Sequence, residues 1–220
     1  MTTPRQRKSP ATLRSVAPEF WRHPSPWMIA ATLGAAAAGR VRAKDWRWRD
    51  AGVPVVAVAL FPLVEWIIHT TTLHFKPRKI GRVTLDFQLA RDHRAHHVDP
   101  RNVPLVFIPW QTLCGVIAAL FAIALAAFRR RALGLTFLTT VGALGLVYEW
   151  THYLIHTDYK PKGRLYRSIW QNHRHHHYKN EHYWFTVTSS GTADKLLGTC
   201  PDPADVPTSP TAKNLFGARR

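Results

Sequence analysis

Ten of the 13 histidines in this chain fall into two copies of one pattern, so a fold that uses them must bring four distant segments together. Each copy has a Glu-Trp pair, then two spaced histidines, then a His-x-x-His-His motif. The first copy contains His69, His74, His93, His96 and His97, and the second contains His152, His156, His173, His176 and His177. Neutral imidazole is a strong ligand for iron, zinc, copper and nickel. The doubled set predicts one pseudo-symmetric site that holds two metals.

Four apolar runs place this site at a membrane. They comprise residues 26–39, 51–68, 103–128 and 132–155. At about 1.5 Å per residue, a helix over the second run covers roughly 27 Å, close to the hydrocarbon thickness of a bilayer. The first run is near the lower length limit and fits either a span or a buried or interfacial helix. The sequence therefore predicts an all-α, multi-pass membrane protein with about four transmembrane helices.

The distribution of basic residues predicts the orientation of these helices. With four spans, both chain ends, the loop between the second and third spans, and all ten patterned histidines share one face. That face carries 22 of the lysines and arginines, and the opposite face carries 8. The positive-inside rule then puts a histidine-rich cap in the cytosol. The expected location is the bacterial inner membrane, or the endoplasmic reticulum membrane of a eukaryote.

Composition excludes several other classes of protein. The net charge of +17 suits anionic headgroups better than nucleic acid, because no zinc-finger, helix-turn-helix or RNA-recognition signature accompanies it. Two cysteines are too few for a disulfide framework or a cysteine-based zinc site. The charged first residues lack a following apolar region, so no cleaved signal peptide is expected. Residues 1–22 and 200–220 are expected to be disordered around one membrane domain at 23–199.

Helical spacing suggests how the ligands converge. His152 and His156 are four residues apart and share one helical face. His69 and His74 are five apart and diverge on a regular helix, so the helix is expected to end or unwind there. Each His-x-x-His-His motif is expected to place its first two rings on one face, with the third ring beside them.

Other polar residues near the pattern have predicted supporting roles. Glu65 and Glu149 are interpreted as hydrogen-bond acceptors that fix histidine tautomers. Glu149-x-x-His152 also matches an element of di-iron carboxylate bundles, but that class needs two such elements and two further glutamates. His175 is a possible additional ligand, and His182 is expected to orient a ligand or contact substrate.

The histidine order resembles that of the membrane fatty acid hydroxylase and sterol desaturase superfamily, and most of all the fatty acid 2-hydroxylases. The resemblance extends from residue 65 to residue 199. It rests on residues 93–100 (HRAHHVDP), 105–109 (LVFIP), 148–156 (YEWTHYLIH), 173–177 (HRHHH) and a closing stretch, 185–199, that contains Asp194. Asp194 is accordingly expected to support the ligands.

The resemblance implies a monooxygenase that uses O2 and two iron ions to hydroxylate or desaturate a lipid acyl chain. Zinc fits the same ligands and is possible in purified protein. The sequence contains no segment similar to cytochrome b5, so the electrons are expected from a separate ferredoxin or cytochrome b5-like protein. The implied partners are thus a lipid substrate, the bilayer and an electron-transfer protein.

Two alternatives remain open at the level of sequence. The same chemistry could act on a sterol or a carotenoid. A membrane metal-binding or transport protein is the alternative from another class, and transport predicts ionisable residues deep inside the spans. Here the cores of the spans lack charges. The sequence leaves open the substrate, the position oxidised, hydroxylation versus desaturation, the donor and the oligomeric state.

Overall fold

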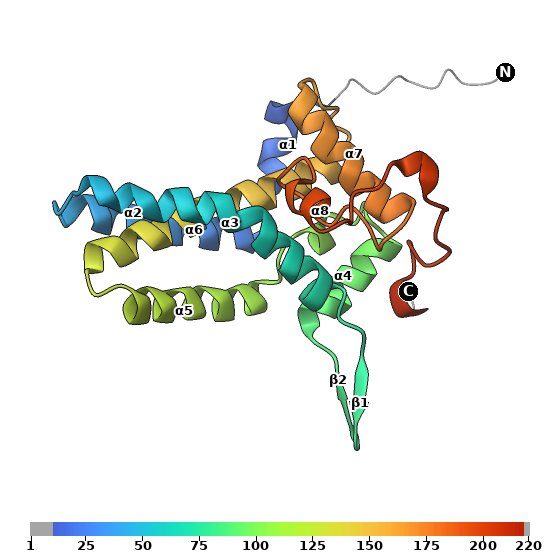
Figure 1. Cartoon of the computed structure of the whole chain (residues 1–220), viewed down its shortest axis with the longest axis horizontal. Coiled ribbons are helices and arrows are strands. Elements are labelled where there is room, and N and C mark those ends of the chain that lie inside the picture. Colours follow the sequence, from blue (N-terminus) through green and yellow to red (C-terminus); the bar gives the residue numbers. More distant parts are fainter. Residues whose placement is uncertain (1–10, 218–220) are drawn as a thin grey trace.

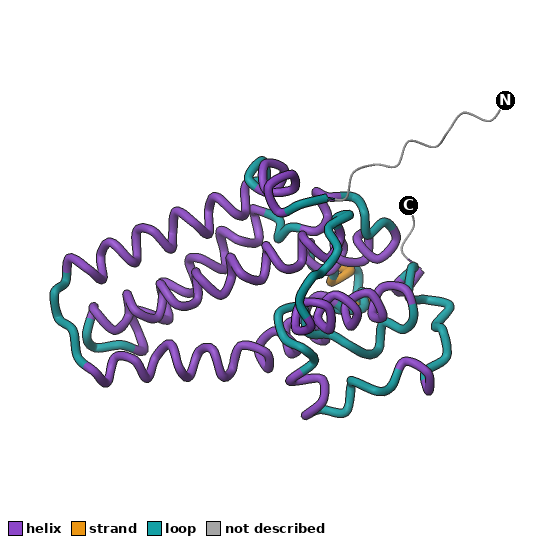
Figure 2. The backbone as a smooth tube through the Cα atoms, turned by 90° about the horizontal axis from the view of Figure 1, so that it is seen from above, coloured by secondary structure: helices purple, strands orange, loops and turns teal. Residues whose placement is uncertain are grey.

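Four long helices run side by side along the long axis of the molecule (Figures 1 and 2). The computed structural model describes residues 11–217. The long helices are α2 (Pro24–Arg42), α3 (Gly52–Ile68), α5 (Trp110–Ala127) and α6 (Arg131–His156). A 3-10 turn, η1 (Trp48–Ala51), and a π-helical turn, η2 (His69–Leu73), extend α3 at its two ends. The predicted helical class is confirmed.

The shorter elements gather at one end of this bundle, and the α2–α3 and α5–α6 turns lie at the other (Figure 1). The cap contains the helices α1 (Leu13–Phe20), α4 (Gln88–Val98), α7 (Arg164–Tyr178) and α8 (Thr192–Leu196), and the 3-10 turns η3 (Val103–Val106), η4 (Pro203–Asp205) and η5 (Leu215–Gly217). One antiparallel hairpin, β1 (Arg78–Ile80) with β2 (Val83–Leu85), projects from the cap. This placement agrees with the predicted topology, in which all patterned histidines share one face.

Three helical segments within residues 11–217 are long and apolar enough to cross a membrane. They are Trp48–Leu73, Val103–Ala127 and Arg131–His156. The first apolar run forms α2, whose 19 residues cover about 28 Å. Helix α2 lies along α6 within the bundle (Figure 1). Multi-pass membrane architecture is thus supported by three helices, and a fourth crossing by α2 stays a prediction.

Small residues allow α2 to approach α6 closely. A Cβ atom added to Gly142 of α6 would lie 3.2 Å from the Cβ of Leu33 and 3.4 Å from its Cα. Inside a membrane, lipid tails are as apolar as leucine, so helices associate through close packing of this kind. Gly142 therefore sets the distance between the two helices.

Replacing Gly142 with leucine should push α2 away from α6 and lower the stability of the bundle by about 1–3 kcal/mol, the usual cost of overpacking. The measurement is the midpoint of unfolding in detergent. Gly115→Leu on α5 is the matched control, because a side chain there meets open space. Equal midpoints for the two variants would show that the α2–α6 contact is not tight.

A network of ion pairs closes the end of the bundle opposite the histidines. Arg40 of α2 donates to Asp50 at 2.8 Å, and both side chains are buried. Arg130, between α5 and α6, donates to Asp50 and to Asp45 at 2.8 Å each. These ion pairs tie α2, the α2–α3 connection and the α5–α6 turn together at this end of the bundle.

Both ends of the described chain are more ordered than the sequence predicts. Helix α1 buries Phe20, and the hydroxyl of Tyr153 donates to the backbone oxygen of Val16 at 2.9 Å. Beyond residue 200, Ala212 and Leu215 are buried. The prediction of disorder is wrong for residues 11–22 and 200–217, because a few apolar side chains suffice to dock a polar segment on a formed surface. Residues 1–10 and 218–220 lie outside the described residues.

Candidate metal centre

The ten patterned histidines form two groups of five at the end of the bundle. Within each group, one ligand atom from every residue lies within 4.8 Å of the others. The first group is His69, His74, His93, His97 and His176, and the second is His96, His152, His156, His173 and His177. Eight of the ten are buried. The groups adjoin, since the rings of His97 and His177 are 4.2 Å apart.

The two groups cross the sequence repeat. The first group takes four histidines from the first copy and His176 from the second, while His96 joins the second group. Neighbouring residues on an α-helix point about 100° apart, whereas residues four apart nearly coincide. His93 and His97 therefore face each other, with their Nε2 atoms 3.2 Å apart, and His96 faces the other group. The prediction that His93 and His96 share a face was wrong.

A π-helical turn brings together the two histidines that are five residues apart. The backbone nitrogen of His74 donates to the carbonyl oxygen of His69 at 3.0 Å, the i to i+5 bond of a π-helix. The wider turn places the two ring centroids 5.0 Å apart. The hydroxyls of Thr70 and Thr71 bond back to the carbonyl oxygens of Trp66 and Ile67. The helix thus widens at this point, where the sequence predicts that it ends or unwinds.

Backbone carbonyl groups fix the tautomers of three histidines in the first group. The Nδ1 atoms of His69, His97 and His176 lie 2.5, 2.8 and 2.8 Å from the carbonyl oxygens of Phe185, Ala212 and Tyr183. A carbonyl oxygen only accepts, so each neutral ring carries its proton on Nδ1 and a lone pair on Nε2. The Nε2 of His69 has no hydrogen-bond partner among the described residues. Three converging lone pairs are the arrangement that a cation needs.

Distances within the groups also fit a bound metal ion. Five pairs of Nε2 atoms, each inside one group, are 3.0–3.2 Å apart. Two nitrogens at about 2.1 Å from one ion lie about 3.0 Å apart at octahedral angles and about 3.4 Å apart at tetrahedral angles. The imidazoles are therefore spaced as neighbouring ligands of one ion are.

Burial keeps the imidazoles outside the spans neutral. It lowers the pKa of His176 to about 4 and the pKa values of His93 and His97 well below the ordinary 6.5. Neighbouring imidazoles lower the pKa values further, because a second positive charge would be repelled. At neutral pH these rings therefore keep the lone pair with which they can bind a metal.

Glu65 and Glu149 accept hydrogen bonds from backbone amides, and not from histidines. The Oε1 of Glu65 accepts from the nitrogens of Val187 and Thr188 at 2.7 and 3.0 Å. The Oε1 of Glu149 accepts from the nitrogen of Ile108 at 3.0 Å. Buried amides outside regular structure require an acceptor, and carbonyl groups already satisfy several imidazole Nδ1 atoms. The predicted role in fixing tautomers was wrong; the two glutamates attach the cap segments to α3 and α6.

Asp194 is connected to the candidate ligand His69 through one residue, Phe185. Its fully buried carboxylate accepts from the nitrogens of Phe185 and Thr186 at 2.8 and 2.9 Å. It also accepts from the hydroxyls of Thr186 and Thr199, at 2.5 and 2.8 Å. The carbonyl group of the same Phe185 holds Nδ1 of His69. Asp194 therefore holds the backbone segment whose carbonyl group orients His69, and this is the way in which it would support a ligand.

The two remaining candidate histidines lie outside both groups. The ring of His175 is 5.3 Å from the ring of Trp184, away from the ligand atoms. The side chain of His182 is 69% exposed, and its Nε2 is 3.6 Å from Glu181. His175, a possible additional ligand in the sequence, is thus not a member of either group, and a role of His182 in orienting a ligand or contacting substrate stays a prediction.

Sequence reasoning missed the carbonyl groups of Tyr183, Phe185 and Ala212. Every residue has a carbonyl group, so no side-chain pattern marks the ones that face an imidazole. A weak signal was present for Phe185, because it lies in the closing stretch that carries the family resemblance. For Ala212 the sequence held no signal.

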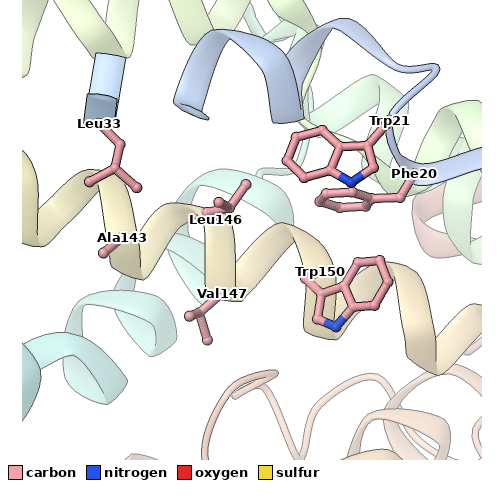
Figure 3. A pocket seen from close by; sticks show the side chains of 7 residues that line it. All are labelled: Phe20, Trp21, Leu33, Ala143, Leu146, Val147 and Trp150. Atoms are coloured by element: carbon pink, nitrogen blue, oxygen red, sulfur yellow. The ribbon is translucent and has the colours of Figure 1, made fainter. Parts of the chain in front are cut away.

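An apolar cavity of about 470 Å³ lies beside α6 (Figure 3). Its seven lining residues come from α1, the residue that follows α1, α2 and α6. They are Phe20, Trp21, Leu33, Ala143, Leu146, Val147 and Trp150. The histidine groups lie outside this lining, and an alkyl chain is the kind of ligand that such a surface suits.

Two adjacent five-histidine groups at the end of helices long and apolar enough to span a membrane indicate a membrane-bound, metal-dependent oxidoreductase. The family model described as fatty acid hydroxylase matches residues 54–199, about two thirds of the chain. The chain belongs to the fatty acid hydroxylase family. This confirms the predicted resemblance and the enzyme class, an O2-dependent lipid hydroxylase.

Individual relatives agree with this family. A dihydroceramide fatty acyl 2-hydroxylase from Arabidopsis thaliana is 25% identical over 192 residues, which cover 83% of this chain and 73% of that protein. A fatty acid 2-hydroxylase from Rattus norvegicus is 28% identical over 141 residues, which cover 63% of this chain but only 37% of the rat protein. The fold is similar to the structure of full-length scs7p, in which only the hydroxylase domain is visible. That comparison has a TM-score of 0.65 and 22% identity, and covers 86% of this chain and 69% of the other.

Proposed function

We propose that this enzyme hydroxylates a lipid acyl chain with O2, with two irons held by the ten histidines and electrons from a separate donor protein. The observation that carries the proposal is the convergence of unprotonated imidazole nitrogens in two adjacent buried groups at the end of membrane helices. The named relatives act on fatty acyl chains at the 2-position. The proposal therefore assigns an acyl chain to this protein as its substrate class, and the 2-position of that acyl chain as the site of hydroxylation.

Bound iron would supply the reduction of O2 and the oxidation of a C–H bond. The chain supplies the surroundings for that chemistry. Burial of eight of the ten histidines excludes bulk water and keeps the rings neutral, and the carbonyl groups hold three of them in the tautomer that presents Nε2. These contacts preorganise the ligands before a metal arrives.

The histidine end is proposed to face the cytosol, either of a bacterium or, in a eukaryote, at the endoplasmic reticulum. The segments of the sequence assigned to this end carry 22 lysines and arginines, and those assigned to the opposite end carry 8. The same basic cap favours an acidic electron carrier, because complementary charge speeds encounter. A ferredoxin or a cytochrome b5-like protein meets this description.

Lipid mass spectrometry of cells that express the protein tests the proposed function. Cells with the wild type should accumulate 2-hydroxy acyl chains, and His173→Ala should reduce them by more than about 100-fold, since even residues that support ligands affect activity about 10–100-fold. His175→Ala is the matched control, because it alters the same helix outside both groups. If the lipids of all three strains match those of cells without the protein, acyl hydroxylation is refuted. If the wild type forms new double bonds in place of hydroxyl groups, the reaction is desaturation.

A further inference from the structure

The segment of residues 207–216, here called the clasp, returns from the end of the described chain to the metal centre. It is anchored to the residues that follow the second His-x-x-His-His motif. The backbone nitrogen of Ser209 donates to the carbonyl oxygen of Lys179 at 2.7 Å, and the side-chain amide of Asn180 donates to the carbonyl oxygen of Pro207 at 3.3 Å. The clasp is therefore attached just beyond the C-terminal end of α7, the helix that bears His173, His176 and His177.

Side chains strengthen this attachment. The hydroxyl of Thr211 donates to the carboxylate of Glu181, which is itself buried. Leu215 is 1% exposed, and the turn it begins, η5, packs against α4. The clasp thus joins the segment that follows α7 to α4, and these two helices carry the His-x-x-His-His motifs.

One atom of the clasp contacts a candidate ligand directly. The carbonyl oxygen of Ala212 accepts the hydrogen bond from Nδ1 of His97 at 2.8 Å, and both residues are buried. His69 and His176 obtain their carbonyl partners from residues 185 and 183, inside the part of the chain that matches the family model. Ala212 lies beyond residue 199, where that match ends. The first histidine group therefore depends on a segment that the family model does not include.

We propose that the clasp is a positioning element that holds His97 with its lone pair on Nε2 and thereby sets the metal affinity of the first group. The proposal rests on the proposed metal binding by the histidines. Without the Ala212 carbonyl group, Nδ1 of His97 loses its fixed acceptor and the ring is free to rotate or to change tautomer. Loss of a partner of this kind typically weakens metal binding about 10–100-fold. The second group has no histidine bonded to the clasp in the described structure, so its metal should be unaffected.

The test uses the full chain with Leu215→Asp, which places a charge where the clasp is anchored. Purified apoprotein in detergent is titrated with Co2+. The visible spectrum of bound Co2+ and the binding isotherm report the affinity of each site without a measurement of enzyme activity. We expect one of the two sites to bind about 10–100-fold more weakly and the other to keep its wild-type affinity. Asn214→Asp is the matched control, because it adds the same charge at an exposed position beside Leu215. Leu215→Ile keeps an apolar side chain at the anchor and should bind Co2+ with wild-type affinity at both sites.

A second variant keeps the test decisive if Leu215→Asp fails to fold. Thr211→Val removes the hydrogen bond to Glu181 at nearly constant volume and should weaken the same site by a smaller factor. Wild-type affinity at both sites in every folded clasp variant would overturn the proposal. A wild-type protein that binds fewer than two Co2+ ions would instead refute the proposed metal centre, so the two failures are distinguishable.

Discussion

His176→Ala combined with His152→Ala should abolish both metal sites, whereas His176→Ala combined with His69→Ala should abolish only one. The structure places His176 with His69 in the first group and His152 in the second. Assignment by sequence copy predicts the reverse, because His152 and His176 belong to the same repeat. Metal content of the purified protein, measured per chain, separates the two assignments.

The single variants complete this experiment. His176→Ala and His96→Ala should each reduce metal content from two ions to about one and lower lipid hydroxylation by more than about 100-fold, since the proposed function requires both metals for one reaction. His175→Ala, adjacent to His176 but outside both groups, is the control for the substitution itself. If one metal were retained by the His176→Ala, His152→Ala protein, the crossed arrangement would be wrong.

Asp194→Ala should cause the largest loss of stability among the residues around the histidines. The substitution leaves the amides of Phe185 and Thr186 buried without an acceptor, and each such group costs about 1–3 kcal/mol. It also releases the carbonyl group that orients His69, so the affinity of the first group should fall about 10–100-fold. Unfolding midpoints in detergent and Co2+ titration measure the two effects.

Asp205→Ala provides the comparison for this prediction, because Asp205 is an exposed carboxylate in the same part of the chain. Its stability and metal affinity should match the wild type. Asp194→Asn should fall between the two, since one oxygen remains to accept while an amide nitrogen faces the bonds to Thr186. A fully stable Asp194→Ala protein would show that water replaces the carboxylate.

Much of this molecule is encoded in local sequence. Apolar runs predicted α3, α5 and α6, because a long apolar helix is formed by consecutive residues and can be recognised from their composition. The doubled histidine pattern singled out the ten histidines that the two groups contain, and spacing of four residues along a helix predicted that pairs such as His152 and His156 share a face. The resemblance to the fatty acid hydroxylases was likewise carried by short continuous motifs.

Only the tertiary structure decided how those residues are used. Whether His96 or His97 faces a given group depends on how α4 and α7 are rotated against each other, and packing between distant segments sets that rotation. The acceptors for Nδ1 are backbone carbonyl groups, which carry no side-chain identity, so Ala212 could not be recognised before the chain was folded. The sequence by itself determined which side chains are candidate metal ligands; the packing of segments far apart in the chain decided which of them lie in the same group.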